Sequence, residues 1–306
     1  MLLLKAQDET QAQDRAQALV RIFPIHFSRT FSMQSLGPYD PTAESGTNLF
    51  RKAFFYRGAP ATLEFQRAPE GLLVTALAPQ AEALLEETLA GLAQDDCYRS
   101  FATDDSGIWR LHRSQPGLRL LRFPWLYEMT CSAILQQRVR TVDAMRDWRH
   151  ITQRWGVAAP LGLWAFPSAE ILARVAQFEL QALDIDAQRA RTLLRFAQES
   201  RFVPLRTTLS FAELRDRLIR IPGIGPWTTE AVLGYGAGDV DAAIPGDLHL
   251  PHVVCYALAG EIPGSDERML ELLEPFRGHR FRIIRLIYAS GLAVPRTTPH
   301  AYELKQ

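Results

Sequence analysis

The chain has 306 residues, of which 47% are hydrophobic and 22% charged, so it can bury one large core or two of ordinary size. It carries 34 Lys and Arg and 34 Asp and Glu, and this zero net charge does not by itself predict nucleic-acid binding. Three cysteines, Cys97, Cys131 and Cys255, exclude a four-cysteine iron–sulfur cluster by number and a zinc knuckle by spacing, and they favour a reducing compartment.

The first ten residues, MLLLKAQDET, offer three leucines before charge appears. Such a stretch builds neither a secretory leader nor a membrane span, so we expect a cytoplasmic protein with no membrane partner. The polar segment that follows is predicted to be helical.

Residues 25–80 alternate apolar and polar positions in short runs such as AFFYRG, TLEFQR and LLVTALA, with Gly, Pro, Asn and Asp between them. This pattern predicts an antiparallel sheet. The next run, AEALLEETLAGLA, has apolar residues at helical spacing and predicts a helix. We therefore expect an α+β first domain over residues 1–118.

The pattern changes around QPGLRLLRFP, and from Phe123 onward helical segments are separated by Pro and Gly. We place the domain boundary near residues 115–122 and predict a mostly helical second domain over residues 119–306. The fold class is therefore α+β, with an antiparallel sheet followed by helices.

Two helices joined by a very tight turn are predicted over residues 211–233. Ser210 followed three residues later by Glu213 is a capping box that begins the first helix, and Pro222 ends it. Gly223 and Gly225 permit backbone torsions that a side chain would oppose.

Pro226 then suits the first turn of the second helix, since its missing N–H is no loss there. Such a turn can approach a phosphate closely and present free N–H groups to it, without reading the base sequence. An ordinary corner between two helices would carry the same residues.

The segment IPGIGPWTTEAVLGYG, followed by IPGDLHL, resembles the hairpin and catalytic loop of the helix-hairpin-helix DNA glycosylases. The closer likeness is to the 3-methyladenine DNA glycosylase II (AlkA) type. The P-x-D-x-H pattern around Asp247 and His249 adds a secondary likeness to 8-oxoguanine glycosylases. Further similar segments occur in the family's order, from AFFYRGAPATLEF through SAILQQRV to LEPFRGHR.

The resemblance implies a hydrolase that releases a damaged, alkylated purine from double-stranded DNA by flipping the base out, in base-excision repair. It implies a monomer that needs no cofactor, associated with the nucleoid in a bacterium or in the nucleus of a eukaryote. The active site is expected in the cleft between the helical parts.

Asp247 takes the role of catalytic carboxylate by resemblance, although Asp after Pro-Gly is in general a turn residue or helix cap. Trp227 stands where bifunctional relatives have a lysine nucleophile, so the resemblance implies direct hydrolysis without strand cleavage. It is also expected to form a wall of the base pocket, although most tryptophans are simply core residues.

Further residues are assigned to DNA by resemblance. Gln137 and Arg138 match the region that fills the gap left by the extruded nucleotide, although a surface helix pair explains them equally well. His249 matches a position near DNA, and with His252 it lacks the third ligand of a zinc site. The hairpin residues expected to contact DNA are Gly223, Ile224, Gly225 and Thr228. The carbonyl groups of Ile219, Ile221 and Ile224 are expected to hold a structural sodium or potassium ion.

Two departures bear on the substrate. Leu248 replaces a tyrosine that follows the catalytic aspartate in the AlkA type, and Arg285 replaces a pocket aromatic. Fewer aromatic rings mean less stacking for a cationic base. Three alternatives remain: an oxidised-purine glycosylase, favoured by D-L-H and disfavoured by Trp227, a non-catalytic DNA-binding protein, and a helical scaffold.

Overall fold

The computed structural model describes residues 14–22, 24–94, 98–205 and 207–295. Cys97 and most of the N-terminal segment predicted to be helical lie outside these ranges. Where that segment is described, the prediction was wrong, because strand β1 (Arg15–Val20) occupies it. β1 pairs antiparallel with β5 (Gly71–Leu77), from Arg15 opposite Leu77 to Val20 opposite Leu72, so pairing to the sheet decides its conformation.

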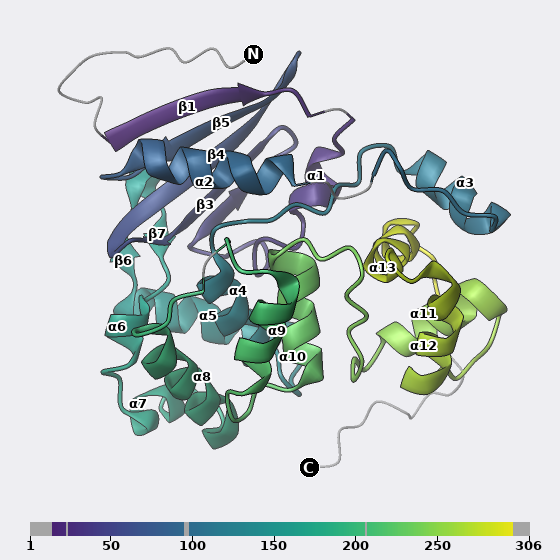
Figure 1. Ribbon diagram of the computed structural model, residues 1–306. Helices are drawn as coiled ribbons and strands as arrows, with labels where there is room; N and C mark the ends of the chain where they lie inside the picture. The colour runs from purple at the N-terminus through teal and green to yellow at the C-terminus, as the bar shows by residue number, and fades with distance from the viewer. Residues whose placement is uncertain (1–13, 23, 95–97, 206, 296–306) are drawn as a thin grey trace.

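The sheet has five antiparallel strands in the order β1-β5-β4-β3-β2. The remaining strands are β2 (Ala43–Ser45), β3 (Leu49–Tyr56) and β4 (Ala59–Ala68). Arg57 and Gly58, the two residues between β3 and β4, both have positive φ, as a tight two-residue hairpin requires. Helix α2 (Ala81–Ala93) covers one face of the sheet (Figure 1). The predicted antiparallel sheet and the helix after it are confirmed.

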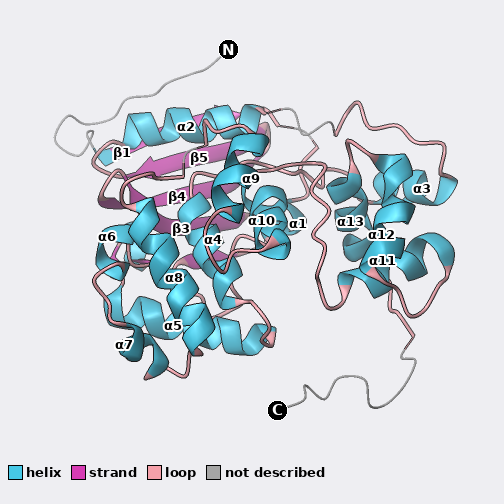
Figure 2. Ribbon diagram, turned by 60° about the horizontal axis from the view of Figure 1, so that its bottom comes forward, coloured by secondary structure: helices cyan, strands magenta, loops and turns pink. Residues whose placement is uncertain are grey.

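The rest of the described chain is mostly helical, which confirms the α+β fold class. In Figures 1 and 2 the helices form two groups, one beneath the sheet and one beside it. The first group holds α4 (Leu126–Leu135), α5 (Thr141–Trp155), α6 (Ala169–Leu172), α7 (Gln177–Gln181), α8 (Ala187–Ser200), α9 (Phe211–Ile219) and α10 (Pro226–Ala231). The second holds α3 (Ser106–Ser114), α11 (Leu250–Ala259), α12 (Asp266–Leu273) and α13 (Arg280–Ala289).

Shorter elements complete the described fold. Helix α1 (Phe27–Phe31) precedes β2, and a small hairpin of β6 (Val157–Ala158) and β7 (Trp164–Ala165) contains the turn η2 (Pro160–Gly162). The π-helical turn η3 (Val232–Gly236) continues α10, and η4 (Glu274–Phe276) follows α12. Among the described residues no helix is both long enough and apolar enough to cross a membrane.

Two hydrophobic cores form, and each takes residues from both sides of the predicted boundary. Phe123 and Trp125, whose rings stack at 4.6 Å, belong to the core of the sheet. Ile108 of α3 belongs to the helical core, where α3 packs against α13. The chain therefore crosses between the two cores more than once, and the boundary at 118/119 stays a prediction.

Candidate active site

The predicted hairpin consists of α9, a tight turn and α10. The Ser210 hydroxyl accepts the Glu213 N–H at 3.2 Å, and the Glu213 carboxylate accepts the Ser210 N–H at 2.8 Å, so the capping box is formed as predicted. Helix α10 begins at Pro226, also as predicted. The sequence signals at both helix starts therefore operate locally.

The two glycines of the turn differ in what requires them. Gly223 has φ +100°, and a Cβ there would lie 2.1 Å from the Thr192 hydroxyl oxygen of α8, so this glycine serves the fold. Gly225 has φ −101°, and a Cβ there would meet nothing within 4 Å. The space beside Gly225 is therefore open to a bound molecule.

Gln137, in the turn after α4, forms hydrogen bonds with the hairpin. Its side-chain amide donates to the Gly223 carbonyl at 3.0 Å and to the Thr228 hydroxyl at 2.9 Å. Thr228 is buried, and Ile224 is only 4% exposed, so its side chain faces the core and only its backbone is available for contacts. Arg138 is exposed and has φ +55°, an uncommon conformation for a residue with a side chain.

Asp247 and Trp227 are brought together although 20 positions separate them. The indole N–H of Trp227 donates to Oδ2 of Asp247 at 2.9 Å. Oδ1 accepts the backbone N–H groups of His249 and Leu250, both at 2.9 Å. Asp247 thus has the turn role of an ordinary Pro-Gly-Asp and is also held against the tryptophan of the hairpin.

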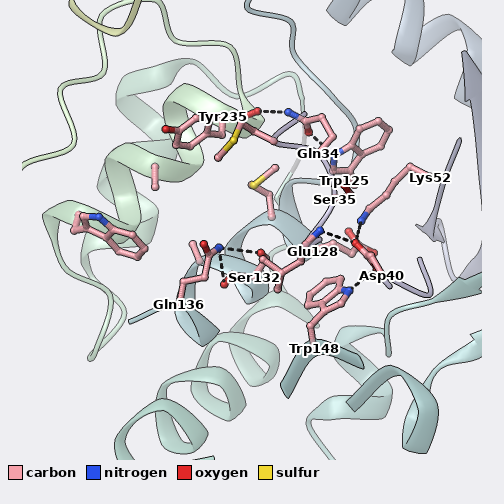
Figure 3. Close-up of a pocket in the computed structure, with 16 residues that line it drawn as sticks. Gln34, Ser35, Asp40, Lys52, Trp125, Glu128, Ser132, Gln136, Trp148 and Tyr235 are labelled. Atoms are coloured by element: carbon pink, nitrogen blue, oxygen red, sulfur yellow. Dashed lines mark hydrogen bonds and ion pairs between the residues drawn. The ribbon is translucent and has the colours of Figure 1, made fainter. Parts of the chain in front are cut away.

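Trp227 lines a pocket between the helices and the segment that follows α1 (Figure 3). The segment supplies Met33 and Gln34, and η3 supplies Tyr235. The Gln34 side chain donates to the Tyr235 carbonyl at 2.8 Å and accepts the Trp125 indole N–H at 2.9 Å. The other lining residues are Ser35, Leu36, Asp40, Lys52, Trp125, Glu128, Met129, Ser132, Ala133, Gln136, Trp148 and Ala231.

One part of the pocket lining carries buried charge. Lys52 is 4% exposed, and its Nζ lies 2.7 Å from the Thr42 hydroxyl and 3.6 Å from Oδ2 of Asp40. The Trp148 indole N–H donates to Oδ1 of Asp40 at 2.8 Å. Burial would raise the pKa of Asp40, but the charge of Lys52 and hydrogen bonds to Asp40 lower it overall.

Glu128 of α4 lies in the same lining and is 2% exposed. Its Oε1 accepts the Phe55 backbone N–H at 3.1 Å. Burial raises the pKa of Glu128 to about 7, against the lowering effects of that hydrogen bond and of Lys52. Both protonation states of its carboxyl group are therefore populated near neutral pH.

The other predicted pocket residues lie elsewhere. Leu248 is 63% exposed and does not line the pocket. Arg285 is buried behind Tyr235, with its guanidinium 5.5 Å from the ring centre and donating to the Arg29 carbonyl at 2.9 Å. Burial raises the pKa of Tyr235 against the lowering effect of the Arg285 charge, and the charge of Asp247 adds to the rise.

Several pocket residues escaped sequence reasoning. Tyr235 had a local sequence signal, because it lies between two glycines. The structure places it in a π-helical turn, a feature often found at functional sites. A Cβ on Gly234 would lie 2.6 Å from the Phe281 ring, and one on Gly236 would lie 2.9 Å from Met129. Gln34 had no local sequence signal, since its hydrogen-bond partners lie 91 and 201 positions away along the chain.

The predicted cation site stays a prediction. Ile219 ends α9, and the Ile221 carbonyl accepts the Ile224 N–H at 2.9 Å. A carbonyl oxygen has two lone pairs, so this hydrogen bond leaves Ile221 able to bind an ion. His252 lies in α11, in the other group of helices, and accepts the Gly264 N–H on Nδ1 at 3.0 Å.

Residues 131–277 match the family described as "HhH-GPD superfamily base excision DNA repair protein". A "DNA-3-methyladenine glycosylase" of Bacillus subtilis is 26% identical over 124 residues, which are 38% of this chain and 41% of that protein. The chain therefore spans less than half the length of this curated relative.

Solved structures give a more extensive match. A "3-methyladenine dna-glycosylase from Archaeoglobus fulgidus" superposes with a TM-score of 0.72 at 20% identity, covering 90% of this chain and 98% of that one. A Clostridium acetobutylicum 8-oxoguanine glycosylase/lyase in complex with double-stranded DNA gives a TM-score of 0.69 at 15% identity, covering 95% and 98%. At these identities the likeness establishes the fold.

Proposed function

Because residues 131–277 form a domain of the HhH-GPD superfamily, we propose that this protein is a monofunctional DNA glycosylase that hydrolyses the N-glycosidic bond of a damaged purine. The observation that carries the proposal is the hydrogen bond between Asp247 and Trp227, within this domain and at the pocket that Trp227 lines. An extruded base would enter the pocket, and its sugar would lie beside Asp247.

The carboxylate of Asp247 supplies the charge that this reaction needs. Cleavage of an N-glycosidic bond builds positive charge on the sugar, and a fixed anion stabilises that charge. Two backbone N–H groups and one indole N–H hold Asp247 in place, so little reorganisation is required as the charge develops. The same carboxylate can orient or deprotonate the attacking water.

The position of Trp227 supports hydrolysis rather than strand cleavage. A lyase needs an amine that forms a Schiff base with the sugar, and an indole cannot do so. Lys52 is the lysine that lines the pocket, but it is buried and engaged with Thr42 and Asp40. This argument also disfavours an oxidised-purine glycosylase with lyase activity.

Double-stranded DNA is the partner that the hairpin fits. Phosphate would lie at the open side of Gly225, and the exposed Arg138 would enter the gap that the extruded nucleotide leaves. The strained backbone of Arg138 supports this assignment, since such conformations gather at functional sites. We include a monomeric enzyme and a sodium or potassium ion at the hairpin carbonyls in the proposal.

Base release from duplexes that each carry one lesion tests the proposal. We expect free alkylated purine as product, and strand incision only after alkali or an abasic-site nuclease is added. Borohydride should trap no covalent complex with wild-type protein, and Lys52→Met serves as the control for the pocket amine. Efficient trapping that Lys52→Met removes would overturn direct hydrolysis, and failure to release any base would overturn the glycosylase assignment.

A further inference from the structure

The pocket contains three charged side chains, Asp40, Lys52 and Glu128. Asp40 and Lys52 form an ion pair with 3.6 Å between Oδ2 and Nζ, so their charges cancel, and both residues are almost fully buried. Glu128 forms no ion pair among the described residues, and from other described residues its carboxylate accepts a hydrogen bond only from the Phe55 N–H. A buried carboxylate without a cation partner is costly, so it favours a cation that enters the same pocket.

Resting on the proposed function, we propose that Glu128 is a specificity-determining residue that gives this pocket its preference for a base bearing a positive charge. An N-alkylated purine such as 7-methylguanine carries that charge on its ring while still attached to the sugar. The carboxylate would be its counter-charge, which aromatic stacking by Trp227 alone does not provide.

The groups around Glu128 leave it the unpaired charge of the pocket lining. Lys52 lowers the pKa of Glu128, but its ammonium is paired with Asp40 at 3.6 Å. Tyr127 and Cys131 neighbour Glu128 on α4. Burial raises the pKa of both Tyr127 and Cys131 well above their ordinary values, so both stay neutral. The charge of the pocket is therefore set by the protonation state of Glu128.

Glu128→Gln isolates this charge, because glutamine has nearly the same shape and can still accept the Phe55 N–H. We would measure the dissociation constants for two duplexes that contain a 2′-fluoroarabinose sugar resistant to hydrolysis. One carries 3-methyladenine, whose ring keeps its positive charge at pH 8 because it has no acidic ring N–H, and the other carries adenine. Both are measured at pH 8, above the pKa of Glu128. Glu170→Gln, an exposed acid outside the pocket, is the matched control.

The wild type and Glu170→Gln should bind the cationic base more tightly, by on the order of tenfold, the value of one charge-assisted contact. In Glu128→Gln this ratio should fall towards one, and Glu128→Asp should restore part of it. If Glu128→Gln weakened the binding of both duplexes equally, or left the ratio of their dissociation constants unchanged, the proposal would be overturned. Since binding is measured without chemistry, a protein that prefers the cation but releases no base would contradict the proposed function alone.

Discussion

Asp247 is positioned for two roles that sequence reasoning treats as alternatives, the turn role that the structure shows and the catalytic role that we propose. Oδ1 accepts two backbone N–H groups and so closes the turn before α11, as Asp after Pro-Gly commonly does. Oδ2 accepts the indole N–H of Trp227, which comes from the hairpin. The turn orients the carboxylate, and the orientation is what a catalytic role requires.

Also at residue scale, the sequence does not show that Glu128 is buried. A glutamate in a helix is normally a solvated residue, and its position in LYEMTCSAILQQ gives no sign of a pocket. Only the packing of α4 against the sheet, where Phe55 donates to it, makes it a buried acid.

Burial of Glu128 predicts a pH dependence of stability. Its pKa is raised from 4.5 to about 7, so the folded state binds the additional proton between these values. The stabilisation of the folded state by this proton is complete below about pH 4.5. As the pH rises towards 7 it is lost, and the free energy of unfolding falls by on the order of 3 kcal/mol. The free energy of unfolding, measured with urea, should decrease more from pH 5 to pH 8 in the wild type than in Glu128→Gln. The same decrease in both proteins would contradict the raised pKa.

At the scale of elements the hairpin was the most predictable part of the molecule. Capping by Ser210, termination near Pro222 and the start at Pro226 depend on neighbours within a few positions, so the sequence displays them directly. The π-helical turn η3 after α10 was not predictable, because the groups that pack against its glycines, Phe281 and Met129, lie far away along the chain. β1 was mispredicted for the same reason, since its strand pairs with distant β5.

The open space at Gly225 predicts how the hairpin binds DNA. Gly225→Asp should leave the fold intact, because its Cβ meets no atom and φ is ordinary for any residue. The added carboxylate should repel phosphate and weaken binding to all duplexes by a similar factor, on the order of tenfold at low salt.

Gly225→Asn is the matched control, since it adds the same volume without charge. We would measure dissociation constants of both variants for several duplex sequences across a range of salt concentrations. The difference between the two variants should shrink as salt rises. Equal affinities of both variants and the wild type at low salt would contradict phosphate contact at Gly225.

At the scale of the whole molecule, the pocket is assembled from segments that lie far apart along the chain. Gln34 follows α1, Glu128 lies in α4, and Trp227 and Tyr235 come from α10 and η3 (Figure 3). The sequence indicated the sheet, the helices and two candidate residues, Trp227 and Asp247, in the segment that matches the HhH-GPD family. It could not indicate Gln34, because no local pattern records which distant residues a buried amide will bridge.

The two cores likewise depend on long-range packing. A change in composition near residue 120 was visible, but Trp125 packs with the sheet and Ile108 packs with the helices. For apolar residues on either side of a composition change, the sequence does not indicate which core each residue joins. This is why the sequence predicts the presence of two cores better than their membership.

The central claim, that Asp247 makes this molecule a glycosylase, is tested most directly by Asp247→Asn. Asparagine can still accept the N–H groups of His249 and Leu250, so the turn should persist while the charge is removed. Asp184→Asn, an exposed change of the same charge, is the control.

Single-turnover release of 7-methylguanine from a duplex is the measurement, with affinity for an abasic-site duplex determined alongside. We predict that Asp247→Asn lowers the rate of base release at least about a hundredfold. Its binding to the abasic duplex should be unchanged or tighter, because a negative charge near phosphate is gone. Base release by Asp247→Asn at the rate of Asp184→Asn and wild type would contradict the account.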